Sequence, residues 1–196
     1  MKVLMHICCS SCSLYPLKNF LAKGIEVKGL WFNPNIHPYP EYRLRLDSLM
    51  KLQKLWDLDV EYADHYGIDD FVRAIGNPDE SRCMRCYAMR LEETAKAARK
   101  MNLDGFTTSL LVSPYQKFEG IVSVGREMGK RHSIPFYEED FRAGYIGNIG
   151  LSRELGLYRQ KYCGCMFSEM ERQIASSAIK TSSPQRRRGI ENSKNG

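Results

Sequence analysis

The amino-acid sequence predicts a three-layer α/β fold with a mostly parallel sheet. Short apolar runs, typical of buried strands, alternate along the chain with longer segments in which apolar residues recur at helical spacing. The chain starts with one such run, a short helix and a second run, and a crossover of this kind makes its two strands parallel. The length of 196 residues fits one domain with a core of its own, and 43% of the residues are apolar, as in ordinary globular proteins.

The first half of the chain supplies the strands and helices that begin this pattern. Residues 2–9 are almost wholly apolar, which predicts a buried parallel strand. Three prolines between residues 33 and 40 predict a shaped loop after the second strand, at the edge where ligand residues lie in open parallel sheets. In this half we expect strands over 2–9, 25–32 and 59–62, and helices over 14–22, 41–56 and 68–74.

The second half continues the alternation. A helix is expected to begin at residues 79–81, with small and apolar residues facing the core and with charged residues, Arg90 among them, facing water. After this helix we expect a strand over 105–111, a helix over 118–132, a short strand over 135–137, and loop and helix from 141 to 169.

The chain is expected to divide into a single domain over residues 1–169 and a basic tail over residues 170–196. The net charge is +6, and most of the excess lies from Met170 onward. This segment is rich in Ser, Gln, Arg and Asn, so we expect it to be disordered. We find no secretory signal and no apolar stretch near the ~18 residues of a membrane span, so we expect a cytoplasmic protein without a membrane partner.

All seven cysteines fall into three short groups separated by long stretches of chain. The first group is Cys8, Cys9 and Cys12, the second group is Cys83 and Cys86, and the third group is Cys163 and Cys165. Spacings this short place sulfurs close enough to share a metal or to bond to each other. In an intracellular protein they favour metal or redox chemistry over structural disulfides.

The first group lies where the first strand runs into the first helix. Phosphate-binding loops occupy this place in nucleotide-binding α/β proteins, and they need glycines so that backbone amides can approach the anion. Ser10 and Ser11 stand between the cysteines instead. The sequence therefore predicts no working phosphate loop.

The second group lies at a helix N-terminus, where exposed amides and the helix dipole favour negative sulfur. Arg82 and Arg85 add positive charge beside it. Together with Cys8 and Cys9, the pair makes a set of four thiolates. By ligand count, this set fits zinc or an iron–sulfur cluster equally.

The third group is a C-x-C pair separated by Gly164. A disulfide across so short a spacing closes a small, strained ring that is easily reduced, which suits a catalytic dithiol. Two further metal ligands are the alternative. A cluster that passes single electrons beside a dithiol that holds two indicates a two-electron reductase.

Five motifs resemble the epoxyqueuosine reductase QueH family: HICCSSCS, WFNPNIHPYPEY, RCMRCYAMRLEETAKAA, FTTSLLVSPYQK and ELGLYRQKYCGCMFSE. The resemblance runs from Lys2 to about Glu169. It implies reduction of epoxyqueuosine to queuosine, the last step of queuosine biosynthesis, at the wobble position of tRNAs for Tyr, His, Asp and Asn. It also implies iron–sulfur chemistry without cobalamin, an unidentified low-potential electron donor, and a fold similar to that of the adenine-nucleotide α-hydrolases.

The same resemblance implies roles for the cysteines in a metalloenzyme domain. Cys8, Cys9, Cys83 and Cys86 match the ligands of a [4Fe-4S] cluster, and Cys163 and Cys165 match a redox-active catalytic pair. The residues between the first cysteines are commonly Ala-Pro in relatives, and the position of Cys12 is acidic in some of them. The role of Cys12 therefore stays open.

Two arrangements of iron remain possible on the sequence alone. Successive side chains of a strand point to opposite faces, so Cys8 and Cys9 share one cluster only if the chain turns between them. In that case one cluster stands beside a Cys163–Cys165 disulfide. Otherwise the cluster adjoins a second, mononuclear iron held by some of the remaining sulfurs, with Cys12 as a ligand.

Two other functions also stay open. One is an iron–sulfur enzyme of the same fold that thiolates tRNA, and the other is a non-catalytic zinc module that binds RNA. For an anticodon loop, we expect recognition by interleaved aromatic and basic side chains. These are Phe32, His37, Tyr39, Tyr87, Tyr115, Lys117, Arg159 and Lys161. Epoxide reduction also needs a proton donor, for which the candidates are Tyr162, Tyr115 and His37.

Overall fold

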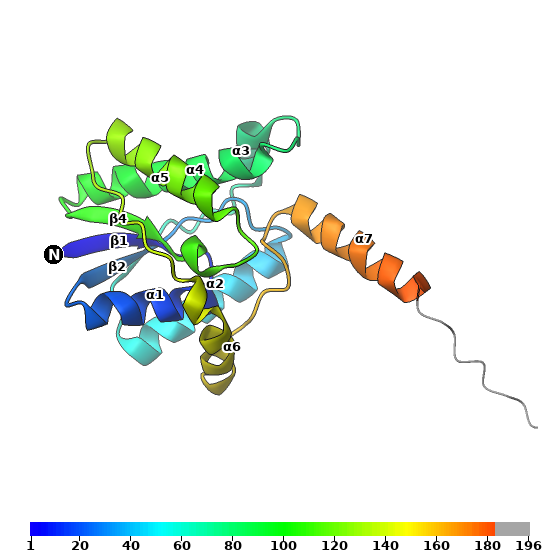
Figure 1. The fold of residues 1–196 in the computed structure, drawn as a ribbon, viewed down its shortest axis with the longest axis horizontal. Coiled ribbons are helices and arrows are strands. Elements are labelled where there is room, and N and C mark those ends of the chain that lie inside the picture. Colours follow the sequence, from blue (N-terminus) through cyan, green and yellow to red (C-terminus); the bar gives the residue numbers. More distant parts are fainter. Residues whose placement is uncertain (183–196) are drawn as a thin grey trace, which may run out of the picture.

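A four-stranded, all-parallel sheet forms the centre of the protein in the computed structural model, which describes residues 1–182 (Figure 1). The strand order is β3-β2-β1-β4. The strands are β1 (Lys2–His6), β2 (Glu26–Trp31), β3 (Val60–Tyr62) and β4 (Gly105–Thr108). The short strand expected at 135–137 is reduced to one parallel bridge between Phe106 and Phe136.

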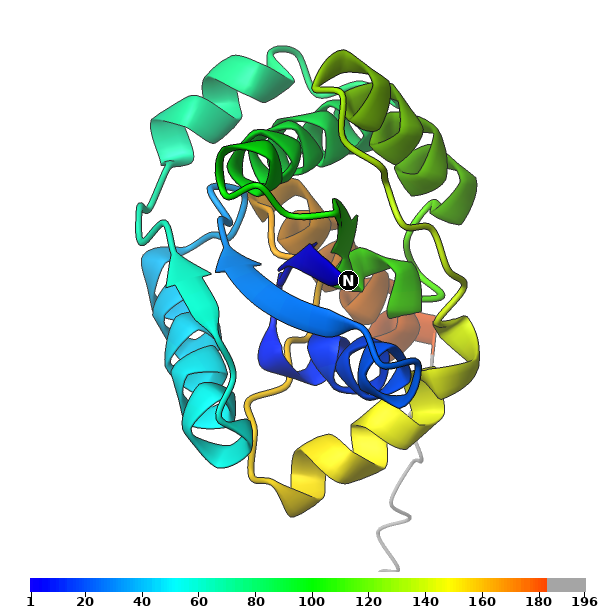
Figure 2. The same ribbon diagram turned by 90° about the vertical axis from the view of Figure 1, so that its left-hand side faces the viewer.

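Helices cover both faces of the sheet, and the predicted three-layer α/β class is confirmed (Figure 2). The layer with α1, α2 and α6 lies on one face, and the layer with α3, α4 and α5 lies on the other. The helices are α1 (Ser10–Ala22), α2 (Tyr39–Trp56), α3 (Ile68–Ile75), α4 (Arg82–Lys100), α5 (Phe118–Arg131), α6 (Tyr145–Glu154) and α7 (Met166–Ser182), with 3₁₀ turns η1 (Ser109–Val112) and η2 (Arg142–Gly144). The expected likeness to the adenine-nucleotide α-hydrolases stays a prediction.

Strand β1 is buried on both faces of the sheet, which explains its nearly continuous apolar sequence. Val3, Leu4 and Met5 of β1 are fully buried, and all four residues of β4 are buried. A strand covered by helices on both faces has no solvent side and therefore shows no alternation of polar and apolar residues.

Two strands end earlier than the sequence predicts, and both ends form the site. β1 stops at His6 because Cys9 caps α1, its sulfur accepting a hydrogen bond from the Cys12 amide at 3.3 Å. β4 stops at Thr108, whose hydroxyl accepts a hydrogen bond from the Leu110 amide and begins η1. Both turns lie at the carboxyl edge of the sheet.

The prediction that Arg90 faces water is wrong. Its side chain is fully buried. Arg90 follows Cys86 by four residues and Cys83 by seven, so it lies on the same side of α4 as the cysteines. That side of the helix packs into the site, whereas the charges at Lys96 and Lys100 are exposed.

Helix α7 crosses the boundary expected at residue 169 and extends away from the body of the protein (Figure 1). Residues 170–182, expected to be disordered, are thus helical. Met166, Met170 and Ile174 recur at helical spacing, and Glu171 forms an ion pair with Arg82. The rest of the predicted tail, 183–196, lies outside the described residues. No helix within residues 1–182 is long and apolar enough to span a membrane.

Candidate functional site

The fold brings the three cysteine groups to the carboxyl edge of the sheet. One cavity of about 480 Å³ is lined by Cys8 and Cys12 of the first group and by Cys163 of the third. A second, much smaller cavity of about 20 Å³ is lined by Cys83, Cys86, Cys163 and Cys165. Cys163 borders both cavities and therefore connects the groups.

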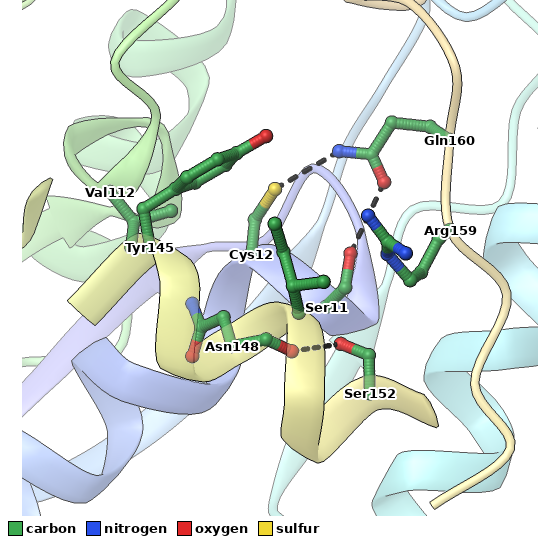
Figure 3. A pocket seen from close by; sticks show the side chains of 9 residues that line it. Ser11, Cys12, Val112, Tyr145, Asn148, Ser152, Arg159 and Gln160 are labelled. Atoms are coloured by element: carbon green, nitrogen blue, oxygen red, sulfur yellow. Dashed lines mark hydrogen bonds between the residues drawn. The ribbon is translucent and has the colours of Figure 1, made fainter. Parts of the chain in front are cut away.

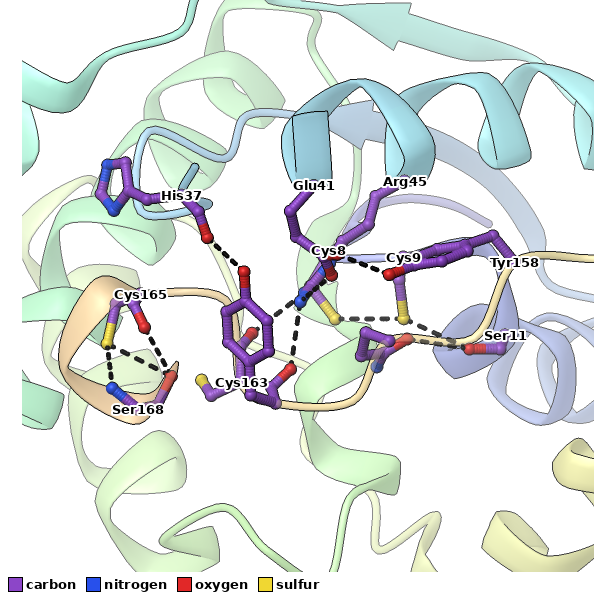
Figure 4. Close-up of polar contacts among 12 residues, drawn as sticks. Cys8, Cys9, Ser11, His37, Glu41, Arg45, Tyr158, Cys163, Cys165 and Ser168 are labelled. Atoms are coloured by element: carbon purple, nitrogen blue, oxygen red, sulfur yellow. Dashed lines mark hydrogen bonds and ion pairs between the residues drawn. The ribbon is translucent and has the colours of Figure 1, made fainter. Parts of the chain in front are cut away.

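The three sulfurs of the first group lie together and are buried. The Sγ atoms of Cys8, Cys9 and Cys12 all lie within 4.8 Å of one another, and those of Cys8 and Cys9 are 3.9 Å apart (Figure 4). The chain has left β1 before Cys8, and Cys9 serves as the N-cap of α1. Cys8 and Cys9 are therefore not successive residues of a regular strand, and their side chains need not point to opposite faces of the sheet.

Cys9 is the most acidic thiol of this group. Burial acts to raise its pKa, but hydrogen bonds from Cys12 and Cys8 and the positive charge of Arg45 bring the pKa well below its ordinary value. Hydrogen bonds to Cys8 and Cys9 hold the pKa of Cys12 well above its ordinary value, because the Cys12 thiol acts as the donor. One thiolate shared by neighbouring donors is a ready starting point for metal binding.

The second group combines one buried and one half-buried thiol. Burial raises the pKa of the Cys86 thiol to about 12, and Cys83 is half-buried in the first turn of α4. The small cavity places this pair beside Cys163 and Cys165. All seven cysteines are free in the structure, so the predicted Cys163–Cys165 disulfide stays a prediction.

The loop that carries the third group is held by Arg45 of α2. Its Nη1 and Nη2 atoms donate to the carbonyl oxygens of Cys163 and Tyr162, each at 3.0 Å (Figure 4). Its Nε atom donates to the Glu41 carboxylate at 2.8 Å, and this carboxylate also accepts a hydrogen bond from the Tyr158 hydroxyl. Arg45 is fully buried, so these contacts are screened from water.

The proline-containing loop at 33–38 holds the other side of the C-x-C turn. The His37 amide donates to the Gly164 carbonyl at 2.8 Å, and the Tyr162 hydroxyl donates to the His37 carbonyl. Gly164 has a φ of +138°, and a Cβ there would lie 3.2 Å from Arg45 Nη1. A glycine is therefore required between the two cysteines by both backbone conformation and space.

The side-chain amides of two glutamines donate hydrogen bonds to cysteine sulfurs of the site. Gln160 donates to Cys12 Sγ at 3.1 Å while its oxygen accepts from Ser11 (Figure 3). Gln116 donates to Cys163 Sγ at 3.3 Å while its oxygen accepts from the Tyr87 hydroxyl at 2.7 Å. Because that hydroxyl accepts from the Lys117 amide, its own proton points to Gln116 Oε1, which fixes the amide orientation.

The wall of the larger cavity combines sulfur with aromatic and basic side chains. Tyr115 lies on it, 82% exposed, and contacts the ring of Tyr145 at a centroid distance of 5.8 Å. Lys161 and Arg172 also line it. Of the expected recognition residues, Tyr87 and His37 are buried and instead support the site.

Sequence reasoning missed the polar residues beneath the sulfurs, namely Arg45, Arg90, Gln116 and Gln160. The available signal was spacing along helices. Glu41 and Arg45 are four residues apart on α2, and Arg90 shares a helix face with Cys86. Gln116 and Gln160 lie outside the helices and strands, so no periodicity marks them.

The donor set fits an anionic, sulfur-bound metal centre, and among the described residues the cysteine sulfurs grouped closely enough to hold one ion are those of Cys8, Cys9 and Cys12. The sulfurs lie beside the buried guanidinium groups of Arg45 and Arg90, and Nη1 and Nη2 of Arg90 have no hydrogen-bond partner within the described part of the chain. A thiolate-bound centre carries the negative charge that such cations require. Fold and site thus define an α/β protein whose sheet edge is built for sulfur-based metal or redox chemistry.

Comparison with known proteins identifies the family to which this chain belongs. A sequence model described as "Epoxyqueuosine reductase QueH" matches residues 3–171. A protein of that name from Dehalococcoides mccartyi is 34% identical over 171 residues, covering 87% of this chain and 94% of the relative. A Thermotoga maritima protein of that name is 34% identical over 188 residues, covering 90% and 95%, respectively. The chain belongs to the epoxyqueuosine reductase QueH family, which is a family of oxidoreductases.

Proposed function

We propose that this protein reduces epoxyqueuosine to queuosine at the wobble position of tRNAs for Tyr, His, Asp and Asn. The observation that carries the proposal is the cavity of about 480 Å³, which joins the buried first group to Cys163 of the redox pair. Its volume is in the range of small-molecule sites. It therefore suits a modified base turned out of the anticodon loop.

We propose Cys8, Cys9, Cys83 and Cys86 as ligands of a [4Fe-4S] cluster, and Cys12 as a ligand of a second iron where one is bound. The separation of 3.9 Å between the Sγ atoms of Cys8 and Cys9 supports a shared centre, and the position of Cys12 Sγ within 4.8 Å of both supports the additional ion. Such a cluster would supply single-electron transfer from a low-potential donor. The remaining chemistry belongs to the side chains of the chain itself, without cobalamin.

The dithiol accounts for the two electrons of the reduction. Cys163 borders the large cavity, so its thiolate sulfur is placed to bond to an epoxide carbon while the C–O bond breaks and the oxygen takes a proton. The sulfur of Cys165 then bonds to that of Cys163 and the C–S bond breaks. The electron pair of the broken C–S bond forms the alkene, and the neighbouring hydroxyl takes a second proton and leaves as water. The two thiol protons balance this step, and the electron donor reduces the resulting disulfide.

The proton for the departing oxygen is best supplied by Tyr115. His37 is buried and its pKa is lowered by burial to about 4, so it is neutral at physiological pH. The Tyr162 hydroxyl is engaged with the His37 carbonyl. Tyr115 lies on the wall of the large cavity, where the substrate would be bound.

The two other functions have less support. A tRNA-thiolating enzyme that activates its substrate with ATP needs backbone amides exposed in a phosphate loop. In this protein Ser10 is buried, and its hydroxyl is hydrogen-bonded to the Ser48 hydroxyl at 2.7 Å. A zinc module gives no reason for a cavity that runs from the first group to Cys163.

Elemental analysis tests the proposed centre directly. In anaerobically purified protein, we expect iron and acid-labile sulfide at about four each per chain for the cluster alone, with one more iron if Cys12 holds the second ion. Both results support a reductase. Zinc without iron would contradict it and favour the zinc module.

A further inference from the structure

Arg90 is a buried cation on the wall of the small cavity, and among residues 1–182 it has no ion-pair partner. Its side chain is fully buried, and its Nε atom donates to the Cys86 carbonyl oxygen at 3.2 Å. Within residues 1–182, Nη1 and Nη2 have no hydrogen-bond partner. A buried charge without a partner is strongly destabilising, so a fold that retains one requires negative charge from elsewhere.

The groups that face this guanidinium are sulfurs. It lines the small cavity together with the second and third cysteine groups. The ring of Tyr87 also faces it, with the guanidinium carbon 5.8 Å from the ring centroid, but a neutral ring supplies no net negative charge. One cation therefore lies beside both of these cysteine groups.

The other buried arginine does not serve this purpose in the same way. Arg45 is neutralised by Glu41, whose carboxylate oxygen lies 2.7 Å from Nη2, and its remaining donors hold the backbone of the C-x-C loop. Arg90 forms no ion pair with a carboxylate in the part of the chain that the structure describes. The net positive charge of the buried site therefore resides on Arg90.

We propose that Arg90 is the buried counter-ion of the sulfur-bound iron centre and that it raises the reduction potential of that centre. This inference rests on the iron–sulfur centre of the proposed function. Each added electron makes the centre more negative, and a nearby cation in a medium of low dielectric stabilises the reduced state more than the oxidised one. Arg90 is thus a positioning and tuning residue, which does not touch the substrate.

Three variants test the inference. Arg90→Met removes the charge and retains apolar bulk, Arg90→Lys retains the charge, and Arg99→Met is the matched control on the exposed side of α4. The thermal midpoint is measured for each protein with and without its iron–sulfur centre, and the reduction potential is measured by spectroscopic titration of the loaded form.

We expect Arg90→Met to leave the midpoint of the metal-free protein unchanged or higher, because an uncompensated buried charge is removed. In the iron-loaded form of Arg90→Met, the thermal midpoint should be lower than that of the loaded wild type, and the reduction potential should also be lower. Arg90→Lys should recover part of the potential, and Arg99→Met should change neither quantity. If the methionine variant does not fold, Arg90→Gln removes the charge with a polar side chain, and an unchanged reduction potential in that variant together with an equal loss of thermal midpoint in both forms would overturn the inference.

Other outcomes separate this inference from the proposed function. Equal loss of midpoint in both forms of Arg90→Met, with an unchanged potential, would show that Arg90 only packs the helix, while the reductase proposal would stand. A wild-type protein that binds no iron–sulfur centre would overturn the proposed function and this inference together.

Discussion

Replacing Arg45 with methionine is expected to lower the free energy of unfolding by about 3–5 kcal/mol, the cost of leaving a buried charge unpaired. The change leaves the Glu41 carboxylate, whose side chain is 8% exposed, without its ion-pair partner. It also removes both donors to the carbonyl oxygens of Tyr162 and Cys163. The C-x-C loop then loses its anchor to α2. Denaturant unfolding gives the free energy, and the reactivity of Cys163 toward a thiol reagent reports the loosened loop.

The control for this prediction is Arg43→Met on the same helix. Arg43 is 37% exposed and pairs with Asp47 across one helical turn, so its loss should cost less than about 1 kcal/mol. The double variant Glu41→Gln/Arg45→Met should recover part of the stability, because no buried charge is left alone. An equal loss in the free energy of unfolding for Arg43→Met and Arg45→Met would contradict the structural role assigned to Arg45.

Changing Cys165 to serine is expected to reduce turnover by ~10³-fold or more while the iron content stays at the wild-type level. Without the second sulfur, no disulfide forms and the C–S bond to Cys163 cannot be resolved. The fold should persist because a serine hydroxyl can also accept the hydrogen bond that Cys165 Sγ receives from the Ser168 amide at 3.4 Å. Iron content and turnover of the same preparation provide the measurement.

Comparison with Cys83→Ser sharpens this prediction, since that variant should lose the cluster and therefore both iron and turnover. Loss of iron in Cys165→Ser as well would show that the C-x-C pair binds metal. The dithiol mechanism would then be wrong, although the four cysteines around the small cavity would still form a metal site.

The layered fold was predictable because short strand-like runs alternate along the chain with longer segments of helical periodicity. Where prediction erred, a local hydrogen bond overrode propensity. Thiols are not among the usual helix caps, so no residue pattern predicted that Cys9 would cap α1 and start it at Ser10, four residues before residue 14. Likewise, the apolar run after Thr108 resembles a strand, but the hydroxyl of Thr108 turns it into η1.

The cysteines of the site were predictable from their spacing, but their environment was not. Clustered sulfurs are visible in a sequence, whereas the burial of Arg45 and Arg90 depends on how α2 and α4 pack around the sheet edge. Charged residues on helices are usually solvated, and this general expectation misplaced Arg90. The grouping of Cys12 with Cys8 and Cys9 likewise depends on the turn at the start of α1.

The most direct test of the central claim is an anaerobic reaction of the iron-loaded protein with tRNA that carries epoxyqueuosine, in the presence of a low-potential reductant. Nucleoside mass spectrometry of the digested tRNA then measures epoxyqueuosine and queuosine. We expect queuosine to appear in proportion to the epoxyqueuosine consumed. Unchanged epoxyqueuosine in the presence of a spectroscopically intact iron–sulfur centre would contradict the proposed function.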